Sequence, residues 1–302
     1  MRLKFITLRE VIAVLSVTAL LTAGCGGGNE TQKTDGTDTT SAVDSAQGAL
    51  INVSGELFSI PSPIQTALLI KGSGAGYSKS ILNPSTKSSQ YSTNFSKAIN
   101  LGIYGADLGY VTIYDQSQDA VGYLNAARKL SDGLGVSAAF DTKTIERFTK
   151  NLGNKDSMLS LVGVAYRASD AYLKTNDRSD VSGLVLAGGW IETLYFTTDI
   201  YKTKSNDEIK RRIAEQKLSL QSLIKLLTPY YSQPEYTKFI DGLHDLATVY
   251  DGVEFKYTFV KPVTDAKKKL TTINSTTDVT ISAEQLEAIS QKIKAIRSQI
   301  VG

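Results

Sequence analysis

The stretch from Ser182 to Tyr201 constrains the fold more than any other part of this 302-residue chain. Its apolar and small residues lie on all sides of a helix, whereas a helix at a protein surface carries them on one face. The stretch therefore predicts a central helix that other helices cover. Its polar exceptions are Glu192, Thr193, Thr197, Thr198 and Asp199.

Helical periodicity and helix-start signals on both sides of this stretch predict the covering helices. Asn83 and Pro84 are interpreted as a cap and a first helical residue, in a helix that continues to about Tyr114. Shorter or later helices are expected over residues 64–70, 115–130 and 141–151 and from Asn154. Three more follow capping boxes, which pair Ser205 with Glu208, Ser232 with Glu235, and Ser282 with Gln285.

One segment departs from the helical pattern. Residues 253–260 alternate apolar and polar side chains with the period of a strand, and residues 278–281 are a candidate partner for it. The predicted fold class is therefore all-α, a single bundle of about eight helices with a small β-hairpin near the C-terminus.

A stripe of small residues marks one predicted helix. Gly102, Gly105 and Gly109 are spaced i, i+3 and i+7, so they share one helix face. Glycine within a helix costs roughly 1 kcal/mol relative to alanine. Three on one face are best explained by the close approach of another helix or of a ligand.

The N-terminus has the layout of an export signal. Basic residues precede an apolar core from Val11 to Leu21, which has signal-peptide length and is too short for a membrane span. The small residues Ala23 and Gly24 then give a peptidase access to the backbone, and the thiol of Cys25 follows directly.

These residues resemble the lipobox of bacterial lipoproteins, although Thr22 stands where the family prefers leucine. The resemblance implies cleavage after Gly24 and an acyl lipid, such as palmitate, on Cys25. The alternative is an ordinary cleaved signal followed by a free cysteine. Because Gly26 rather than aspartate follows Cys25, the chain resembles lipoproteins of the outer membrane that face the periplasm, with the inner membrane as the alternative location.

Three regions follow from these patterns. Residues 1–24 are the predicted signal peptide, residues 25–48 the lipidated cysteine with a disordered tether, and residues 49–302 the helical domain. The tether is rich in Gly, Thr, Asp and Ser, and it lacks the apolar residues that would offset the entropy of ordering it.

Composition excludes several classes of site. Removing the three basic residues and one acidic residue of the leader from the 33 basic and 30 acidic residues leaves 30 and 29, which gives no nucleic-acid footprint. A single cysteine excludes a disulfide framework, and a single histidine excludes a histidine-rich metal site. Gly72–Gly76 lacks the strand and the Gly-Lys-Ser/Thr ending of a phosphate loop, so no cofactor is expected.

The central stretch presents a candidate site. Glu192, Tyr195 and Asp199 are spaced i, i+3 and i+7, and a buried carboxylate in such a setting has a raised pKa that suits a general acid or a ligand anchor. The favoured interpretation is structural, with Glu192 paired to an arginine on a neighbouring helix. The arginines considered are Arg128, Arg147 and Arg167.

A second candidate cluster lies beside the glycine stripe. Asp107 occurs there with Tyr104, Tyr110 and Tyr114 at nearby turns, and it is interpreted as part of a hydrogen-bond network between crossing helices.

Several segments resemble those of uncharacterised all-helical lipoproteins of Bacteroidetes. They are residues 100–110, 114–118, 128–132 and 185–192. The resemblance implies lineage and architecture, and it carries no activity.

The predicted function is a lipid-anchored periplasmic binding or scaffolding protein of the cell envelope, without catalysis, for an envelope protein or a small ligand. The alternative is an envelope enzyme that uses Glu192 or Asp107 as a general acid or base. A weaker alternative is an α-solenoid adaptor, which requires helix pairs stacked in a row. An open cavity at Glu192 would favour the enzyme, whereas a closed Glu192 bonded to arginine would count against it.

Overall fold

The computed structural model describes residues 49–53, 56–60, 63–136, 142–151, 153–154, 156–161, 163–164 and 178–302. All of them belong to one compact unit, Asp38–Gly302. The predicted signal peptide, the cleavage site at Gly24, the lipidation site at Cys25 and the tether lie outside the described residues.

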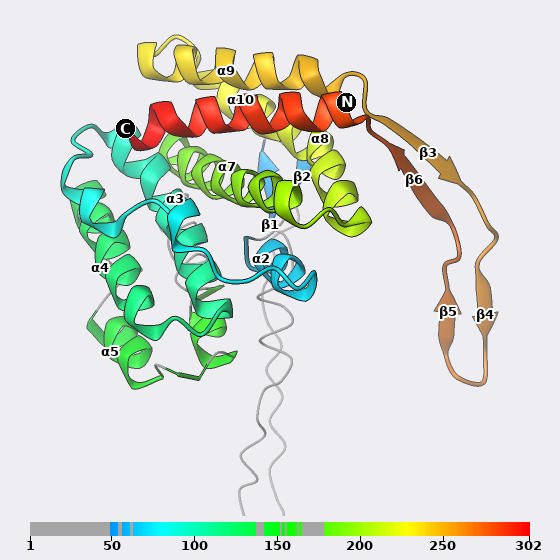
Figure 1. The fold of residues 1–302 in the computed structure, drawn as a ribbon, viewed down its shortest axis with the longest axis horizontal. Coiled ribbons are helices and arrows are strands. Elements are labelled where there is room, and N and C mark those ends of the chain that lie inside the picture. Colours follow the sequence, from blue (N-terminus) through cyan, green and yellow to red (C-terminus); the bar gives the residue numbers. More distant parts are fainter. Residues whose placement is uncertain are drawn as a thin grey trace, which may run out of the picture. The chain divides into compact units, whose positions relative to one another are not determined.

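The described residues form a bundle of helices, which confirms the predicted all-α class (Figure 1). The helices are α2 (Pro63–Gly72), α3 (Asn94–Ile113), α4 (Ser117–Leu134), α5 (Thr142–Lys150), α7 (Ser179–Thr203), α8 (Asp207–Leu227), α9 (Pro234–Tyr250) and α10 (Ala283–Val301). Short 3-10 turns are η1 (Lys79–Ile81), η2 (Ser85–Ser89) and η4 (Thr228–Tyr230).

Helix α7 is the centre of the bundle, as its sequence predicts. Nearly all its residues from Val181 to Thr198 are buried, and it contacts α2, α3, α8 and α10. The buried hydrophobic residues form one cluster around it. The helices therefore surround a single core and are not stacked in a row as a solenoid requires.

The buried threonines of α7 form hydrogen bonds within the helix. Thr193 donates to the carbonyl of Gly189 at 2.6 Å, and Thr197 donates to the carbonyl of Thr193 at 2.6 Å. A threonine hydroxyl that bonds the preceding helical turn is not left unpaired when it is buried. For this reason threonine is tolerated in an otherwise apolar helix.

Glycines allow a very close contact between α3 and α7. A Cβ atom on Gly102 would lie 2.0 Å from the carbonyl oxygen of Val185, and one on Gly188 would lie 1.9 Å from that of Ile99. Because these distances are far inside van der Waals contact, only glycine fits at either position. The predicted close approach is thus confirmed as a helix crossing at Gly102. Gly109 instead faces the side chain of Ile64 in α2.

The start of α3 differs from the prediction. The helix begins at Asn94, where Thr93 caps it in a capping box with Ser96, and not at Pro84. The side-chain amide of Asn83 is buried and donates to Tyr91 Oη at 3.0 Å instead of capping a helix. Pro84 precedes only the short turn η2, so the cap-and-proline signal marks a turn here.

Two of the three predicted capping boxes are also wrong. Asn206, not Ser205, caps α8 by accepting from the backbone N–H groups of Glu208 and Ile209. Helix α9 begins after Gln233 with Pro234 at its first position and has no side-chain cap. The box of Ser282 with Gln285 is confirmed at the start of α10. A neighbouring residue that offers a better cap or a proline displaces the motif.

Other helix boundaries agree with their sequence signals. Helix α4 ends where Gly135 adopts a left-handed conformation, with φ of 74°. The predicted helix from Asn154 is present over 156–161, and Asn154 Oδ1 accepts from the backbone N–H of Ser157 at 3.0 Å. Its continuation beyond residue 164, and the predicted cap Asp141, lie outside the described residues.

The predicted hairpin is confirmed as β3 (Glu254–Thr258) paired antiparallel with β6 (Thr276–Thr280). Its extension by β4 (Val263–Asp265) and β5 (Leu270–Thr272) was not predicted, and neither was the pair β1 (Ala49–Val53) and β2 (Glu56–Ile60). Over the described residues, no helix combines the length and hydrophobicity needed to cross a bilayer.

Candidate functional site

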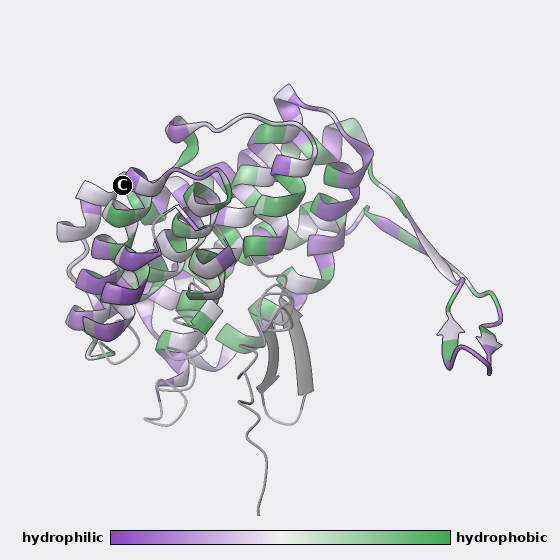
Figure 2. Ribbon diagram, turned by 90° about the horizontal axis from the view of Figure 1, so that it is seen from below, coloured by the Kyte–Doolittle hydropathy of each residue, from purple (hydrophilic) through white to green (hydrophobic). Residues whose placement is uncertain are grey.

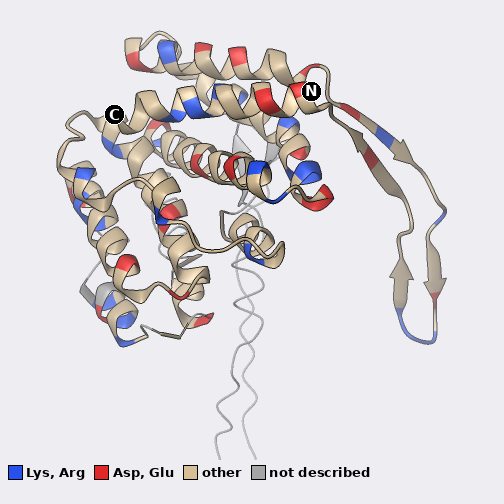
Figure 3. Cartoon of the chain, in the orientation of Figure 1, with Lys and Arg blue, Asp and Glu red and all other residues tan. Residues whose placement is uncertain are grey.

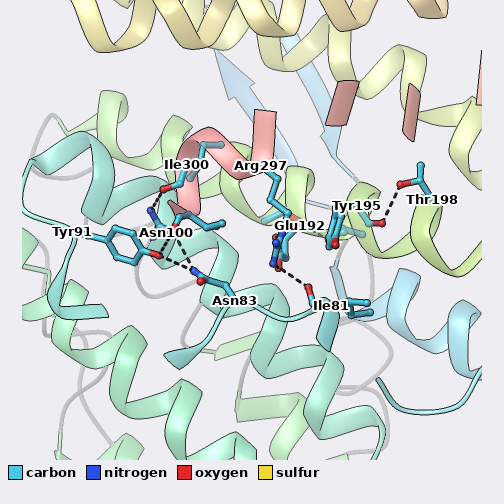
Figure 4. Close-up of polar contacts among 12 residues, drawn as sticks. Ile81, Asn83, Tyr91, Asn100, Glu192, Tyr195, Thr198, Arg297 and Ile300 are labelled. Atoms are coloured by element: carbon cyan, nitrogen blue, oxygen red, sulfur yellow. Dashed lines mark hydrogen bonds and ion pairs between the residues drawn. The ribbon is translucent and has the colours of Figure 1, made fainter. Parts of the chain in front are cut away.

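The candidate site is a buried ion pair between α7 and α10. Arg297 of α10 donates from Nε to Glu192 Oε2 and from Nη2 to Glu192 Oε1, each at 2.6 Å (Figure 4). Its Nη2 also donates to the carbonyl of Ile81 at 3.0 Å, and the guanidinium lies 4.3 Å from the ring centroid of Tyr195. Such a two-pronged bond fixes the relative position of the two helices.

The sequence of α10 places Arg297 in this position. The apolar stripe of α10, which faces the core, includes Leu286, Ile289, Ile293 and Ile296. Arg297 follows Ile293 by four residues, so it continues the same stripe. Its side chain is only 11% exposed, while that of Glu192 is 0% exposed. Two charges out of water are stable together only because each supplies the other's hydrogen bonds.

Asp107 of α3 completes the cluster as a second buried carboxyl. Burial raises the pKa of Asp107 well above its usual range, and the charge of Glu192 raises it further. Within the described part of the chain, neither oxygen of Asp107 has a hydrogen-bond donor. The raised pKa favours the neutral acid, and a neutral group without donors costs less to bury than a carboxylate without donors.

The pKa values of Glu192 and Arg297 depend on each other. Burial also raises the pKa of Glu192, but hydrogen bonds and charge from Arg297 oppose that effect. For Arg297, burial lowers the pKa, and its bonds to Glu192 outweigh burial and raise it. The net shift of the pKa of Glu192 is upward, as it is for Asp107, so the two carboxyls titrate as a coupled pair beside one arginine.

A network of amides and phenols connects the cluster's surroundings to the end of α10 (Figure 4). Asn83 donates to Asn100 Oδ1 at 3.3 Å, and Asn100 donates to the carbonyl of Ile300 at 3.3 Å. Tyr91 Oη donates to the carbonyl of Val301 at 3.4 Å, and Tyr104 donates to that of Pro84 at 3.0 Å. Of the residues predicted to form a network with Asp107, Tyr104 belongs to this group, whereas Asp107 itself makes no hydrogen bond with a described residue.

The remaining predicted residues lie apart from the ion pair. Tyr110 is fully buried, accepts from the backbone N–H of Ser78 and packs on Phe196, with ring centroids 5.1 Å apart. Tyr114 donates to the carbonyl of Ala75. Asp199 is half-buried and makes no ion pair among the described residues.

An arginine partner for Glu192 was predicted and is present, but the three arginines considered were wrong. Arg128 is exposed and lies 3.7 Å from Asp132 on the same helix, Arg147 is exposed on α5, and Arg167 lies outside the described residues. The residue that binds is Arg297, which sequence reasoning missed. The signal that could have found it is a single arginine on the apolar stripe of an amphipathic helix.

This arrangement closes the candidate site to solvent. Glu192 and Asp107 are 0% exposed, and the arginine occupies both oxygens of Glu192. Over the described residues, no three His, Cys, Asp or Glu side chains come together to hold a metal ion. The geometry thus shows two shielded carboxyls and an ion pair that holds α7 against α10.

Comparisons with known proteins yield no relative. No protein-family model matches the chain, and neither a curated protein nor a solved structure matches it significantly.

Replacing Asp107 with asparagine is expected to flatten the pH dependence of stability. Folded Asp107 keeps its proton, whereas the unfolded carboxyl loses it above about pH 4. The folded state then binds more protons, so the free energy of unfolding of the native protein falls as pH rises. Asparagine mimics the protonated acid, and its stability relative to the native protein should rise by up to about 1.4 kcal/mol per pH unit between pH 5 and the folded pKa. Urea denaturation across this range measures the difference.

The control is the same series at high salt. Salt screens surface charges but has little effect on a buried group. The difference between Asp107→Asn and the native protein should therefore persist. Parallel stability curves at low salt would show that Asp107 is ionised in the fold.

Proposed function

We propose that this chain is a lipid-anchored, periplasm-facing protein of the bacterial outer membrane that binds or scaffolds an envelope partner. The sequence around Cys25 supports the anchor, and the confirmed helical bundle supports a domain held by that anchor. The sealed ion pair supports a structural role for the buried carboxyls, since a general acid must reach its substrate.

The observation that carries the binding role is a surface groove of about 220 Å³ between α3, α9 and α10. Its buried lining residues Ile99, Phe239 and Ile296 are apolar, and its exposed ones are polar, a composition that suits a small ligand or a short peptide segment. The lining residues are Phe95, Ser96, Ile99, Glu235, Lys238, Phe239, Gly242, Ile296, Gln299 and Ile300. Glu235 and Lys238 place one charge of each sign at the rim, so an occupant with both polar and apolar groups fits best.

The enzyme alternative has less support. It requires a cleft that reaches Glu192 or Asp107, and both side chains are fully buried. Both oxygens of Glu192 also accept hydrogen bonds from Arg297, so neither is available to a substrate. A binding role needs neither a cleft at these residues nor a free acid.

Capture of cross-linked partners from membranes tests the binding role. Gln299→Trp fills the groove from an exposed position on α10, and it is expected to remove the partners that the native protein retains. Ala295→Trp places the same side chain on an exposed part of α10 that does not line the groove, and it should retain them. Equal partner sets for both variants would contradict binding in the groove.

Lipid attachment at Cys25 is tested in the same cells by metabolic labelling. An alkynyl fatty acid should label the native protein and not Cys25→Ala, because the acylated thiol is absent from the variant. Equal labelling would rule out the lipid on Cys25 and leave the result for the groove intact.

A further inference from the structure

The hairpin arm, residues 254–280, carries most of the exposed apolar side chains. Nine large hydrophobic residues are exposed among those whose side chains the structure describes, and six of them lie between positions 257 and 273. They are Tyr257, Phe259, Val260, Val263, Leu270 and Ile273, each between 42% and 73% exposed. This concentration is unusual, because exposed apolar residues normally occur singly.

The arm extends away from the helices as a two-stranded ribbon (Figures 1 and 2). Only its base is packed on the core, through the half-buried pair Phe255 and Val279, which lie opposite each other in β3 and β6. Further out, Val263 and Leu270 lie on one face of the β4–β5 pair, since Leu270 is opposite Asp265 and Val263 is two residues from Asp265. These outer side chains do not contribute to the core.

The end of the arm is basic (Figure 3). Lys267, Lys268 and Lys269 form the turn between β4 and β5, and the carboxylate of Asp265 accepts from the backbone N–H groups of the first two. Lys268 lies 3.9 Å from Asp265 at an exposed position, and the other two make no ion pair among the described residues. The whole arm contains five lysines and three acidic residues, so its net charge is positive.

We propose that the hairpin arm lies on a membrane surface that contains anionic phospholipid. Lysines attract anionic headgroups, and their long stems let the ammonium groups reach the phosphates while neighbouring apolar side chains enter the interface. A phenol ring such as that of Tyr257 is favoured at the same depth. Basic and apolar groups side by side on an exposed two-stranded arm match a lipid surface, which requires charge and apolar area rather than a complementary shape.

That a membrane lies within reach of the arm rests on the proposed anchor at Cys25, but the affinity of the arm for lipid does not. The arm is therefore tested without the acyl chain. The protein is the chain from residue 25 with Cys25→Ser, which retains the whole compact unit Asp38–Gly302. The probes are vesicles of equal parts phosphatidylglycerol and phosphatidylcholine, and vesicles of phosphatidylcholine alone.

The native arm is expected to bind the anionic vesicles, more weakly as salt is added, and to bind phosphatidylcholine poorly. Reversing the tip charges with Lys267→Glu, Lys268→Glu and Lys269→Glu should weaken binding at least about tenfold. Val263→Ser with Leu270→Ser leaves the charge unchanged and should also weaken binding. The matched control reverses three exposed lysines outside the arm, Lys143, Lys150 and Lys204, and should retain native affinity.

Because the substituted residues are exposed, each variant should unfold at the native temperature. Thermal unfolding of each variant checks that the bundle is intact. Absence of binding to anionic vesicles would overturn the proposal, and so would an equal loss in the control variant. A molar mass that falls from dimer to monomer when the arm is changed, with vesicle binding unaffected, would assign the arm to a second copy of the chain. Failure of the alkynyl fatty acid to label Cys25 would contradict the anchor and would leave the affinity of the arm for lipid unaffected.

Discussion

Replacing Gly188 with alanine is expected to lower the free energy of unfolding by about 3 kcal/mol or more. The added methyl group would lie 1.9 Å from the carbonyl oxygen of Ile99, and a backbone oxygen cannot rotate out of the way as a side chain can. Helices α3 and α7 would have to separate along their main contact. The midpoint of thermal unfolding should fall by about 5 to 10 °C, measured by circular dichroism.

Gly109→Ala is the matched control on α3. Its Cβ would meet Ile64 Cγ1 at 3.6 Å, which is an ordinary contact. Alanine has a helix propensity advantage of up to about 1 kcal/mol over glycine, so this variant should be as stable as the native protein or slightly more. Gly102→Ala should resemble Gly188→Ala, since its methyl group meets Val185 O at 2.0 Å. A Gly188→Ala protein of native stability would show that the two helices are farther apart.

Replacing Arg297 with methionine is expected to cost about 3 to 5 kcal/mol. Methionine fills much of the same space, but it leaves Glu192 buried without a cation and Asp107 beside it. The loss should be smaller at acidic pH, because a protonated Glu192 no longer needs the arginine. Urea denaturation at pH 5 and pH 8 measures both values.

The double variant Arg297→Met with Glu192→Gln is the test of cause. If the cost comes from an unpaired buried charge, removing that charge should recover part of the stability, and the two changes will not be additive. A double variant no more stable than Arg297→Met alone would mean that the arginine contributes by packing on Tyr195 rather than by charge.

Much of the fold was predictable because its signals are local. The burial of α7 follows from its uniform hydrophobicity, and the strand at 254–258 follows from its alternation. Helix starts were less predictable, because Asn83-Pro84, Ser205 and Ser232 all have cap chemistry, and tertiary contacts or a better neighbouring residue decided the outcome. The extension β4–β5 has few apolar contacts and hence no strong pattern.

The candidate site was predictable only in part. A buried carboxylate requires a cation, so an arginine partner for Glu192 followed from chemistry alone. Which arginine binds depends on the packing of α10 against α7, a contact between residues 105 positions apart that no local pattern encodes. The proximity of Asp107 to Glu192 likewise depends on the crossing of α3 and α7, where Gly102 and Gly188 allow the two backbones to meet.

The long separation between Glu192 and Arg297 has a consequence for the order of folding. A chain is synthesised from its N-terminus, so α3 and α7 exist before α10 does. Until Arg297 is present, closing α3 on α7 would bury the carboxylate of Glu192 without its counter-charge. We expect the docking of α10 to be the step that completes the core. The ion pair thus links closure of the core to the last helix of the described chain.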